Sequence, residues 1–500
     1  MTHPDTPLTE RACGVLLHIS SLPSAWGIGD VGPAAREFAQ RLGRARLRYW
    51  QVLPLNPTTP GADESPYFSS SSRAGNPLFI SLEDLVGAGL LEAEELEAPP
   101  GASETGDFAF ARGAKEPLLA RAARRVVSRN APAFLAFCQE NADWLDDHAL
   151  FTSLSARLGL RWRDWPEPLK RRDTAALAAA GVELGERIEE EKALQYLFSC
   201  QWQVLRATCE NCGVSLFGDM PIYVNTDSAD VWASPGVYQL DDALNPSLEA
   251  GVPPDYFSST GQLWRNPVYD WTQLQKDGFN WWIKRLRTLL ERLDLLRIDH
   301  FRGLAQYWAV QAGAETAEHG RWLDVPSEAF FDALRAAIVP LPLVAEDLGT
   351  ITPDVIALRD RYGLPGMIVL HFAFYDDNHD NPYKPENQRE NAVAYLGTHD
   401  NNTTLAWLDG ELDDAARDRL SRYVACQNGE DGVLAMTELL LSSRARLAIV
   451  CAQDLLRLPG DARMNTPGVT PGNWRWRLTP AQFDALPLDW LGQQCRSHGR

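Results

Sequence analysis

The sequence has no apolar segment long enough to form a membrane helix. Its 500 residues contain no uninterrupted apolar run near the ~18 residues that would cross a bilayer. Residues 1–16 also lack a basic stretch followed by an apolar one, the pattern of a secretory signal peptide. We therefore expect neither membrane insertion nor secretion, and we expect the protein to work in the cytoplasm.

Positive charge is also scarce. The chain has 47 Lys and Arg residues against 67 Asp and Glu residues, which gives a formal net charge of -20. Such a surface repels nucleic acid and anionic membranes, so we expect neither as a partner. The charge keeps the chain soluble and does not name a function. The oligomeric state stays open between a monomer and a weak dimer.

Cysteines are few and scattered for a chain of this length. The eight of them fit reduced thiols in a cytosolic enzyme better than a disulfide framework. Cys209 and Cys212 form a CxxC pair, but it has neither a second pair nor a nearby His to complete a zinc site. We find no EF-hand-like run, and no glycine-rich phosphate loop accompanies an expected strand. We therefore expect no metal, no cofactor and no use of a nucleotide sugar.

Tryptophan, by contrast, is abundant. The sequence contains 17 tryptophans, and most of them are expected to pack in the core. Sugar rings present flat C–H faces that stack on aromatic rings. An acidic protein rich in Trp is therefore a candidate for carbohydrate binding.

Continuous apolar runs that end in polar residues recur along the chain, with helical stretches between several of them. A continuous run, rather than an alternating one, indicates a strand buried on both faces of a parallel sheet. Length alone suggests roughly three domains, but one barrel with insertions also accounts for it. We therefore predict an α/β fold, a (β/α)8 TIM barrel, whose strands lie in the runs Gly14–Ser20, Tyr49–Pro57, Ser215–Val224, Leu295–His300, Leu341–Gly349, Met367–Phe374, Ala392–Asp400 and Leu447–Asp454.

One gap interrupts this rhythm. From about Ser81 to Asn211 the sequence is helix-like and rich in Ala, Leu, Arg and Glu. This segment is far too long for a connection between a strand and a helix of the barrel. We predict that residues 81–211 form an inserted, mainly helical subdomain, and that residues 1–80 and 212–500 form the catalytic barrel.

Acidic residues follow four of the expected strands directly. They are Asp219, Asp299, Glu346 and Asp400, and the carboxyl ends of barrel strands are where active sites lie. A single acid in this position is commonly the N-cap of the next helix. Several acids on one rim also suit a retaining glycosidase, which needs two carboxyl groups about 5–5.5 Å apart.

Longer segments around these acids resemble those of a known enzyme family. Arg297–Gly303, Ala345–Gly349 and Gly397–Asn401 are similar to the three catalytic segments of the amylomaltases, the 4-α-glucanotransferases of glycoside hydrolase family 77. The resemblance runs in order from about residue 14 to 477. The other matching segments are Ser20–Ser24, Gly27–Asp30, Trp50–Leu55, Ser65–Tyr67, Ala74–Pro77, Phe217–Val224, Gly251–Asp255, Thr260–Trp264, Ala462–Asn465 and Gly472–Trp474.

The resemblance implies three catalytic residues. Asp299 is expected to be the nucleophile that forms a covalent glucosyl-enzyme, and Glu346 the acid/base. Asp400 is expected to bind sugar hydroxyls and to favour the distorted, oxocarbenium-like ring. Arg297, two residues before the nucleophile on the same strand face, is expected to hold it ionised.

The resemblance also implies a set of substrate-binding residues around these carboxylates. Tyr67 is expected to stack under the sugar at the cleavage point, and Asp219 to bond within the subsite or to Arg297. For each histidine of the set, a purely structural hydrogen bond is an equal alternative. The full expected set is Tyr67, Asp219, Arg297, His300, His399, Asn401, Asp255, Gln262 and Trp264.

Residues 251–270 are expected to form a loop that closes over the site. The Asp255–Trp264 stretch contains Ser, Thr and Gly, which suit a hinged lid, and Trp264 would stack on a sugar. The stretch departs from the family pattern in two places. Arg265 stands where Gly is usual, and Ser259 where an acidic residue is often found.

The expected substrates are α-1,4-glucans, namely maltooligosaccharides, amylose, starch or glycogen, with glucose as a further acceptor. A hydrolase of the α-amylase type would use the same residues with water as acceptor. A non-catalytic glucan-binding barrel is a rival of another class, but it predicts the loss of a catalytic acid, and Asp299, Glu346 and Asp400 are all present.

Overall fold

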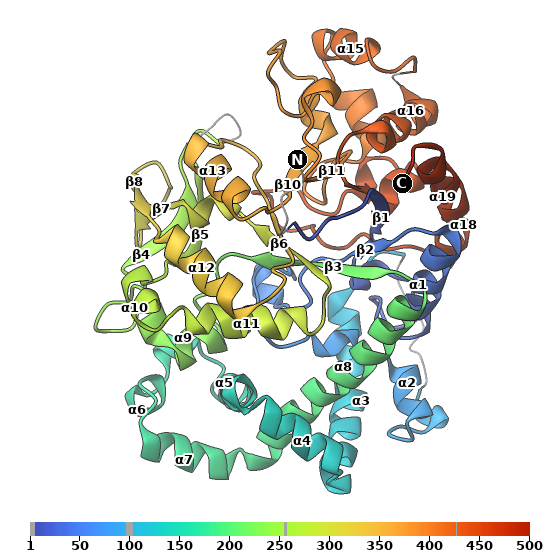
Figure 1. The fold of residues 1–500 in the computed structure, drawn as a ribbon. Coiled ribbons are helices and arrows are strands. Elements are labelled where there is room, and N and C mark those ends of the chain that lie inside the picture. Colours follow the sequence, from blue (N-terminus) through green and yellow to red (C-terminus); the bar gives the residue numbers. More distant parts are fainter. Residues whose placement is uncertain (1–5, 97–103, 255–257, 427) are drawn as a thin grey trace.

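The computed structural model describes residues 6–96, 104–254, 258–426 and 428–500. Within these residues, eight parallel strands form a nearly closed barrel in the order β10-β11-β12-β1-β2-β3-β6-β9 (Figure 1). Each strand lies in, or overlaps, one of the apolar runs of the sequence, so the predicted barrel is confirmed. The strands are β1 (Ala12–Leu16), β2 (Tyr49–Gln51), β3 (Ser215–Pro221), β6 (Leu295–Asp299), β9 (Leu343–Ala345), β10 (Gly366–Val369), β11 (Ala392–Tyr395) and β12 (Leu447–Cys451).

The barrel closes between β9 and β10 through a few polar contacts. The backbone N–H of Ala345 donates to the carbonyl of Pro365 at 2.8 Å. Beyond the end of β9, the buried carboxylate of Asp347 accepts the N–H of Met367 at 2.7 Å and pairs with the guanidinium groups of Arg359 and Arg389. Asp347 therefore has a structural role at this seam.

The interior of the barrel is filled by alternate residues of its strands. Since successive strand residues point to opposite faces, one residue in two faces inward, and these residues pack into a separate apolar cluster. The cluster comprises Leu8, Ala12, Leu16, Phe217, Leu295, Val344, Met367, Val393, Tyr395, Leu447, Ile449 and Cys451. Because the alternation continues along each strand, polar residues two or four positions beyond these residues also face the barrel interior.

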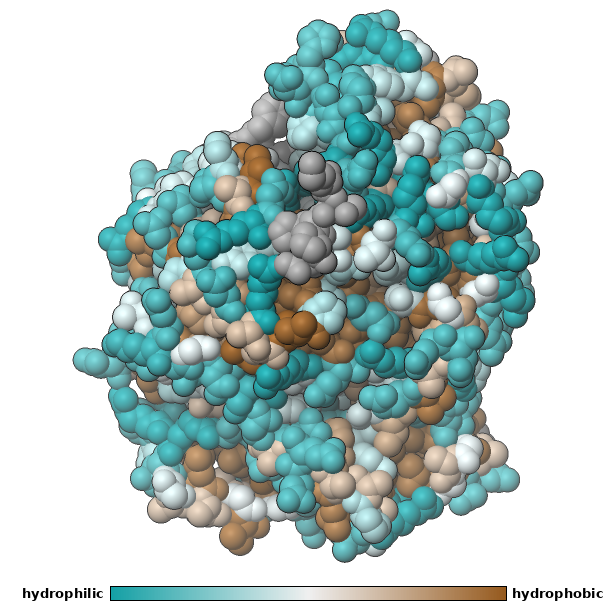
Figure 2. All heavy atoms as spheres, viewed as in Figure 1, coloured by the Kyte–Doolittle hydropathy of each residue, from teal (hydrophilic) through white to brown (hydrophobic). Residues whose placement is uncertain are grey.

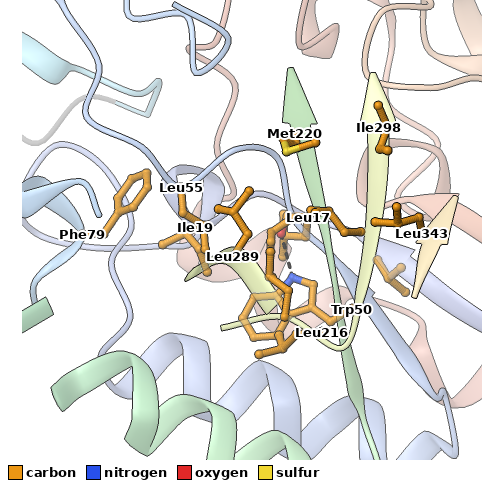
Figure 3. Packing of buried hydrophobic residues seen from close by; sticks show 14 of the residues in the cluster. Leu17, Ile19, Trp50, Leu55, Phe79, Leu216, Met220, Leu289, Ile298 and Leu343 are labelled. Atoms are coloured by element: carbon orange, nitrogen blue, oxygen red, sulfur yellow. Dashed lines mark hydrogen bonds between the residues drawn. The ribbon is translucent and has the colours of Figure 1, made fainter. Parts of the chain in front are cut away.

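The other strand residues face the surrounding helices and belong to the main core. Figure 3 shows Leu216, Met220, Ile298 and Leu343 in this cluster together with Leu289 of α11 (Asn280–Leu290). The indole N–H of the buried Trp50 donates to the carbonyl of Leu17 at 2.7 Å, the dashed line in Figure 3. A large side chain that carries a polar group is thus buried without leaving that group unpaired.

Helices surround the barrel and continue to the C-terminus. The first of them, α1 (Pro33–Ala45), buries an apolar face that includes Phe38 and Leu42, and it contacts α19 (Leu488–Ser497). The remaining helices of this group are α9 (Ala229–Ala233), α10 (Trp271–Lys276), α12 (Ser327–Ala337), α13 (Pro353–Arg361), α14 (Thr404–Ala406), α15 (Asp414–Ser421), α16 (Gly429–Ser442), α17 (Ala452–Leu455) and α18 (Pro480–Ala485).

Between β2 and β3 the described chain is helical, as the composition of this segment predicts. The long helix α8 contacts α3, α4, α5 and α7, and these helices lie together in the lower part of Figure 1. Because α8 also contacts α1 and β3, it links this group to the barrel. The helices are α2 (Leu82–Gly87), α3 (Phe108–Arg129), α4 (Pro132–Glu140), α5 (Ala142–Leu158), α6 (Glu167–Lys170), α7 (Thr174–Glu183) and α8 (Gly185–Asn211).

A second sheet, which the sequence did not predict, lies beside the barrel. It is antiparallel, with the order β5-β4-β7-β8 among the described residues. Its strands are β4 (Leu248–Val252), β5 (Gln262–Pro267), β7 (Gln306–Gln311) and β8 (Gly320–Asp324). The segment expected to be a loop over residues 251–270 therefore includes two paired strands, in which Gly251 faces Leu263 and Val252 faces Gln262.

The surface seen in Figure 2 is predominantly hydrophilic. Among the residues that the structure describes, no helix combines the length and apolar character needed to cross a membrane.

Candidate active site

Asp219, Asp299 and Glu346 lie where the alternation of the barrel strands places them. Phe217 and Leu295 point into the barrel, so Asp219, Arg297 and Asp299, two or four residues further along the same strands, face the same way. Asp219 pairs in register with Arg297 on the neighbouring strand. Three charged side chains are thereby brought together at the carboxyl end of the barrel.

Arg297 is the centre of this group. Its Nη1 donates to both carboxylate oxygens of Asp219, at 2.8 and 2.7 Å, and its Nη2 lies 2.8 Å from Oδ1 of Asp299. Arg297 and Asp219 are 4% and 3% exposed, whereas the Asp299 side chain is 32% exposed. The two buried residues therefore orient Asp299, which alone of the three remains open to a ligand.

Glu346 follows β9, the strand beside β6. Its Oε2 accepts the backbone N–H of His300 at 2.7 Å, and its Oε1 accepts the N–H of Leu348 at 3.0 Å. His300 has a φ of 55°, in the left-handed region, and this conformation accompanies the bond from its N–H to the carboxyl group. The backbone of two loops thus fixes Glu346 beside the Asp299 strand.

The two carboxyl groups have different protonation behaviour. Burial raises the pKa of Glu346 to about 8; the Arg297 charge opposes the rise and the Asp299 charge adds to it. Burial also raises the pKa of Asp299, to about 6, and here Arg297 is the main opposing influence. Near pH 7 the site therefore holds an ionised Asp299 and a protonated Glu346, the pair that a retaining glycosidase needs.

Tyr67 links Asp219 to the far side of the site. Its hydroxyl donates to Oδ2 of Asp219 at 2.8 Å and lies 2.8 Å from Nε2 of His399. Since the single hydroxyl proton is used on Asp219, which accepts only, Nε2 of His399 must carry the proton of the second bond. The Tyr67 and His399 rings also stack, with centroids 5.5 Å apart and an interplanar angle of 13°.

Asp400 follows His399 and is 39% exposed. Nδ2 of Asn465 donates to its Oδ1 at 2.6 Å, and Nη2 of Arg463 donates to its backbone carbonyl at 2.6 Å. Asn401 turns the other way, because its Oδ1 accepts from both the N–H and the hydroxyl of Thr398. In this conformation Asn401 shapes the loop that presents Asp400.

His300 and Trp264 bring the second sheet up to the barrel rim. The two rings meet edge to face with centroids 4.8 Å apart, and the Trp264 indole N–H donates to Oε1 of Gln262 at 3.4 Å. Burial lowers the pKa of His300 to about 4, so the imidazole is neutral near pH 7. Arg265 has a φ of 62°, a conformation that favours glycine, and its side chain pairs with Glu249.

Asp255, one of the expected substrate-binding residues, lies outside the described residues. Apart from Asn401, which bonds Thr398, and Glu346, which bonds the backbone of His300 and Leu348, the expected residues fall into two groups. One is a connected network from Asp299 through Arg297, Asp219, Tyr67 and His399 to Asp400, and the other is the pair His300–Trp264 with Gln262. Within the described chain, no group of His, Cys, Asp and Glu could hold a metal ion.

Three residues at the site were not predicted to have a role there. Asn465 bonds Asp400, and the Trp474 ring lies 5.7 Å from that of Tyr67. Nδ1 of His18, just after β1, accepts the N–H of Leu53 at 3.2 Å, and burial, with a smaller contribution from the nearby His399, lowers the pKa of His18. His18 follows a strand as the rim acids do, so its position in the sequence is a signal of the same kind.

Comparisons with known proteins agree with this geometry. A family model described as 4-alpha-glucanotransferase matches residues 17–482. The 4-alpha-glucanotransferase of Thermus thermophilus is 45% identical over 485 residues, which cover 95% of this chain and 96% of that protein. That of Synechocystis sp. is 45% identical over 493 residues, covering 97% of this chain and 96% of that protein.

A solved structure gives the same result for the fold. The amylomaltase from Streptococcus agalactiae, in complex with acarbose, superposes with a TM-score of 0.94 at 34% identity, covering 98% of this chain and all of that chain. The resemblance seen in the sequence is thus confirmed. The chain belongs to glycoside hydrolase family 77, the 4-α-glucanotransferases, and has the activity of that family, the transfer of α-1,4-glucan segments.

Proposed function

We propose that this chain transfers glucan segments by a retaining double displacement, with Asp299 as nucleophile and Glu346 as acid/base. The observation that carries the proposal is the contrast between the two carboxyl groups. Asp299 is paired with Arg297 and its pKa is raised to about 6, whereas Glu346 accepts two backbone N–H groups and its pKa is raised further, to about 8. One is ready to attack and the other to give up a proton.

In the first step a carboxylate oxygen of Asp299 attacks the anomeric carbon of the donor glucan. The bond between that carbon and the glycosidic oxygen breaks, and Glu346 transfers its proton to the departing oxygen. Arg297 holds one Asp299 oxygen, Oδ1, at 2.8 Å, so the other is the attacking atom. The products are a glucosyl ester on Asp299 and a shortened glucan with a free 4-OH.

In the second step the 4-OH of an acceptor attacks the same carbon. Glu346, now ionised, takes the hydroxyl proton, and the ester bond to Asp299 breaks. Two inversions retain the α configuration. The acceptors are maltooligosaccharides, amylose, starch or glycogen, and glucose.

Asp400 and the residues bonded to it bind the reacting sugar. With its Oδ1 held by Asn465, Asp400 is positioned to accept hydrogen bonds from sugar hydroxyls that strengthen as the ring distorts. His300, at the rim, is a donor to the same sugar, and His399, whose Nε2 proton is used on Tyr67, is a further contact to it. Tyr67 provides a ring beneath it, and its stacking on His399 fixes the orientation of that ring.

Residues 251–270, which include the end of β4 and all of β5, form a lid over the active site. Trp264 and Gln262 stand on β5, and Trp264 contacts His300 at the rim. Water at ~55 M outnumbers any sugar, so transfer requires that the ester is shielded while the acceptor is bound. Asp255 is part of this proposed lid.

The wider organisation is part of the same proposal. Residues 81–211 are a helical subdomain inserted in the barrel of residues 1–80 and 212–500, and the protein is a monomer or weak dimer of the cytoplasm. The eight cysteines are all free thiols, which fits a reducing compartment.

A fluorinated glucosyl donor tests the assignment of the nucleophile, because the electron-withdrawing fluorine slows breakdown of the ester. Digestion and mass spectrometry should find the label on the peptide that contains Asp299. Label on another residue, with Asp299 unmodified, would refute the assignment.

The product profile from maltotriose alone tests transfer against hydrolysis. Longer maltooligosaccharides together with glucose are the expected result. Maltose and glucose in equal amounts, without longer products, would mean that water resolves the ester.

A further inference from the structure

A cavity outside the active site lies between the helical segment and the barrel helices. It measures about 220 Å³ and is bounded by α5, α9, the start of α11 and the stretch Ser71–Arg73. None of the described residues that line it belongs to the active site. Its size is below the ~300 Å³ at which pockets for drug-sized ligands begin, so it suits one or two small rings.

The cationic groups at this cavity, Arg73 and Lys284, are paired with Asp143. Asp147 pairs with Arg172, and Asp277 is an exposed carboxylate at the rim. Asp143 accepts a bidentate contact from Arg73, with Nη1–Oδ2 at 3.1 Å, and its Oδ2 lies 3.5 Å from Lys284 Nζ. Asp230 accepts the N–H and the hydroxyl of Ser72 at 2.7 and 2.6 Å. Because the cations are neutralised by carboxylates, the cavity favours a neutral ligand over an anion.

Other polar side chains also line the cavity. His148 is 4% exposed, lines the cavity, and has a buried Nδ1 with no hydrogen-bond partner. Burial lowers the pKa of His148 to about 4, so the ring is neutral near pH 7 and offers one donor and one acceptor. Asn280 and Asp277 add exposed polar side chains at the rim.

Two tryptophans complete the wall. Trp144 is buried beneath Arg73, whose guanidinium lies 5.7 Å from the ring centroid. Trp281 is only partly buried and is supported by Tyr238 and Arg285, at 5.9 and 5.6 Å. An indole held in place from behind, with polar groups around it, provides what a sugar ring needs, namely a flat apolar surface and hydroxyl partners.

We propose that this cavity is a second saccharide-binding site, which takes a neutral glucosyl unit of a glucan chain. Trp281 is the stacking surface, and Asn280, Lys284 and His148 are hydrogen-bond partners of the hydroxyl groups. The site holds glucan without cleaving it. The proposal does not depend on which carboxylate is the nucleophile.

A thio-linked maltotrioside tests the proposal in the wild-type protein, since its sulfur-bridged linkages resist cleavage. Isothermal titration calorimetry should show two binding sites. Hydrogen exchange should slow in peptides from α5 and the start of α11 in addition to peptides from the active site. The double variant Asn280→Ala/Lys284→Ala should lower the affinity of the second site about tenfold, and Trp281→Ala should abolish it.

Lys276→Ala provides the matched control, because Lys276 is an exposed lysine on α10 that does not line the cavity. It should leave both sites unchanged. Trp281→Ala can disturb folding, but Asn280 and Lys284 are exposed, so their variants keep the test decisive. A single binding site, a second site unaffected by these substitutions, or protection of α5 by inorganic phosphate and not by the thio-maltotrioside would each overturn the proposal.

Discussion

Two arginine–carboxylate clusters at adjacent positions of the barrel pair their buried groups in opposite ratios. At the seam, the buried carboxylate of Asp347 is paired with Arg359 and Arg389, and Arg359 also pairs with the exposed Asp360. At the active site, Arg297 is shared by Asp219 and Asp299. A buried carboxylate that meets two guanidinium groups is held in a fixed structural role, whereas two carboxylates that share one guanidinium leave the partly exposed one, Asp299, open to a ligand.

The difference arises between neighbours in the sequence. Glu346 and Asp347 follow the same strand, and the alternation of side chains sends them to opposite sides. Glu346 joins the barrel interior and meets backbone N–H groups, while Asp347 meets the guanidinium groups at the seam. A position in the fold, rather than residue type, therefore decides which acid takes part in catalysis.

The same substitution in the two clusters gives the largest expected contrast. Asp299→Asn removes the nucleophile and should lower kcat by about 10⁴-fold or more, with the melting temperature little changed. Asp347→Asn breaks a buried charge pair and should cost about 3–5 kcal/mol of stability, with kcat per folded molecule nearly retained. Steady-state kinetics and thermal unfolding of both variants check this. A loss of kcat in folded Asp347→Asn like that in Asp299→Asn would remove the distinction.

Tyr67→Phe should have a smaller effect, because it removes one hydroxyl from the network between Asp219 and His399. We expect kcat/KM to fall about tenfold, as for the loss of one or two hydrogen bonds in a catalytic site. Tyr395→Phe is the control, since its buried hydroxyl donates to Gln51 inside the barrel at 2.9 Å. That variant should lose stability and keep its kcat/KM; the reverse pattern would contradict the assigned roles.

Trp264→Ala should alter how the glucosyl ester is resolved, with a few-fold change in the ratio of hydrolysis to transfer. The rate at which the ester forms should change less. Loss of the indole weakens acceptor binding and shielding, so the ratio of hydrolysis to transfer should rise. The measurement is the release of glucose and longer products from maltotriose. Trp322→Ala, in β8 of the same sheet, removes a ring that packs on Trp308 and should leave the ratio unchanged. An unchanged ratio in Trp264→Ala would disprove the lid role.

Arg265→Gly should have the smallest effect. Arg265 has a φ of 62°. Glycine relieves this left-handed conformation, which stabilises the folded state by about 1 kcal/mol, but it also makes the unfolded chain more flexible, which offsets part of the gain. Arg46, at the C-cap of α1 with a φ of 61°, is the matched position. Both variants should unfold at a similar or slightly higher temperature. Only Arg265→Gly should alter the ratio of hydrolysis to transfer. An identical change in Arg46→Gly would show that the effect does not depend on the β4–β5 hairpin.

The barrel and the positions of the four rim acids could be predicted from the sequence. Each barrel strand lies in or overlaps an apolar run, and the acids Asp219, Asp299, Glu346 and Asp400 stand at or just beyond the ends of such runs. The second sheet could not be predicted, because its strands mix apolar with polar and charged residues, as in Gln262–Pro267. Its pairing also joins segments far apart in the chain.

The support around the acids was likewise hidden. Asn465 and Trp474 reach the site from the C-terminal loops, and only the three-dimensional fold brings them to Asp400 and Tyr67. The protonation of Glu346 depends on its burial and on the Arg297 and Asp299 charges. A residue's position after a strand can suggest that it reacts, but not in which protonation state.

The pH dependence of kcat/KM for wild type and Glu346→Gln tests the central claim most directly, the assignment of opposite protonation states to Asp299 and Glu346. Wild type on a maltooligosaccharide should lose activity below about pH 6, as Asp299 becomes protonated, and above about pH 8, as Glu346 ionises. With α-glucosyl fluoride, whose leaving group needs no proton, Glu346→Gln should retain most of the wild-type kcat/KM. Its pH profile should show only the loss of activity on the acid side. Equal losses on both donors, or an alkaline limb near pH 8 that persists without Glu346, would contradict the account.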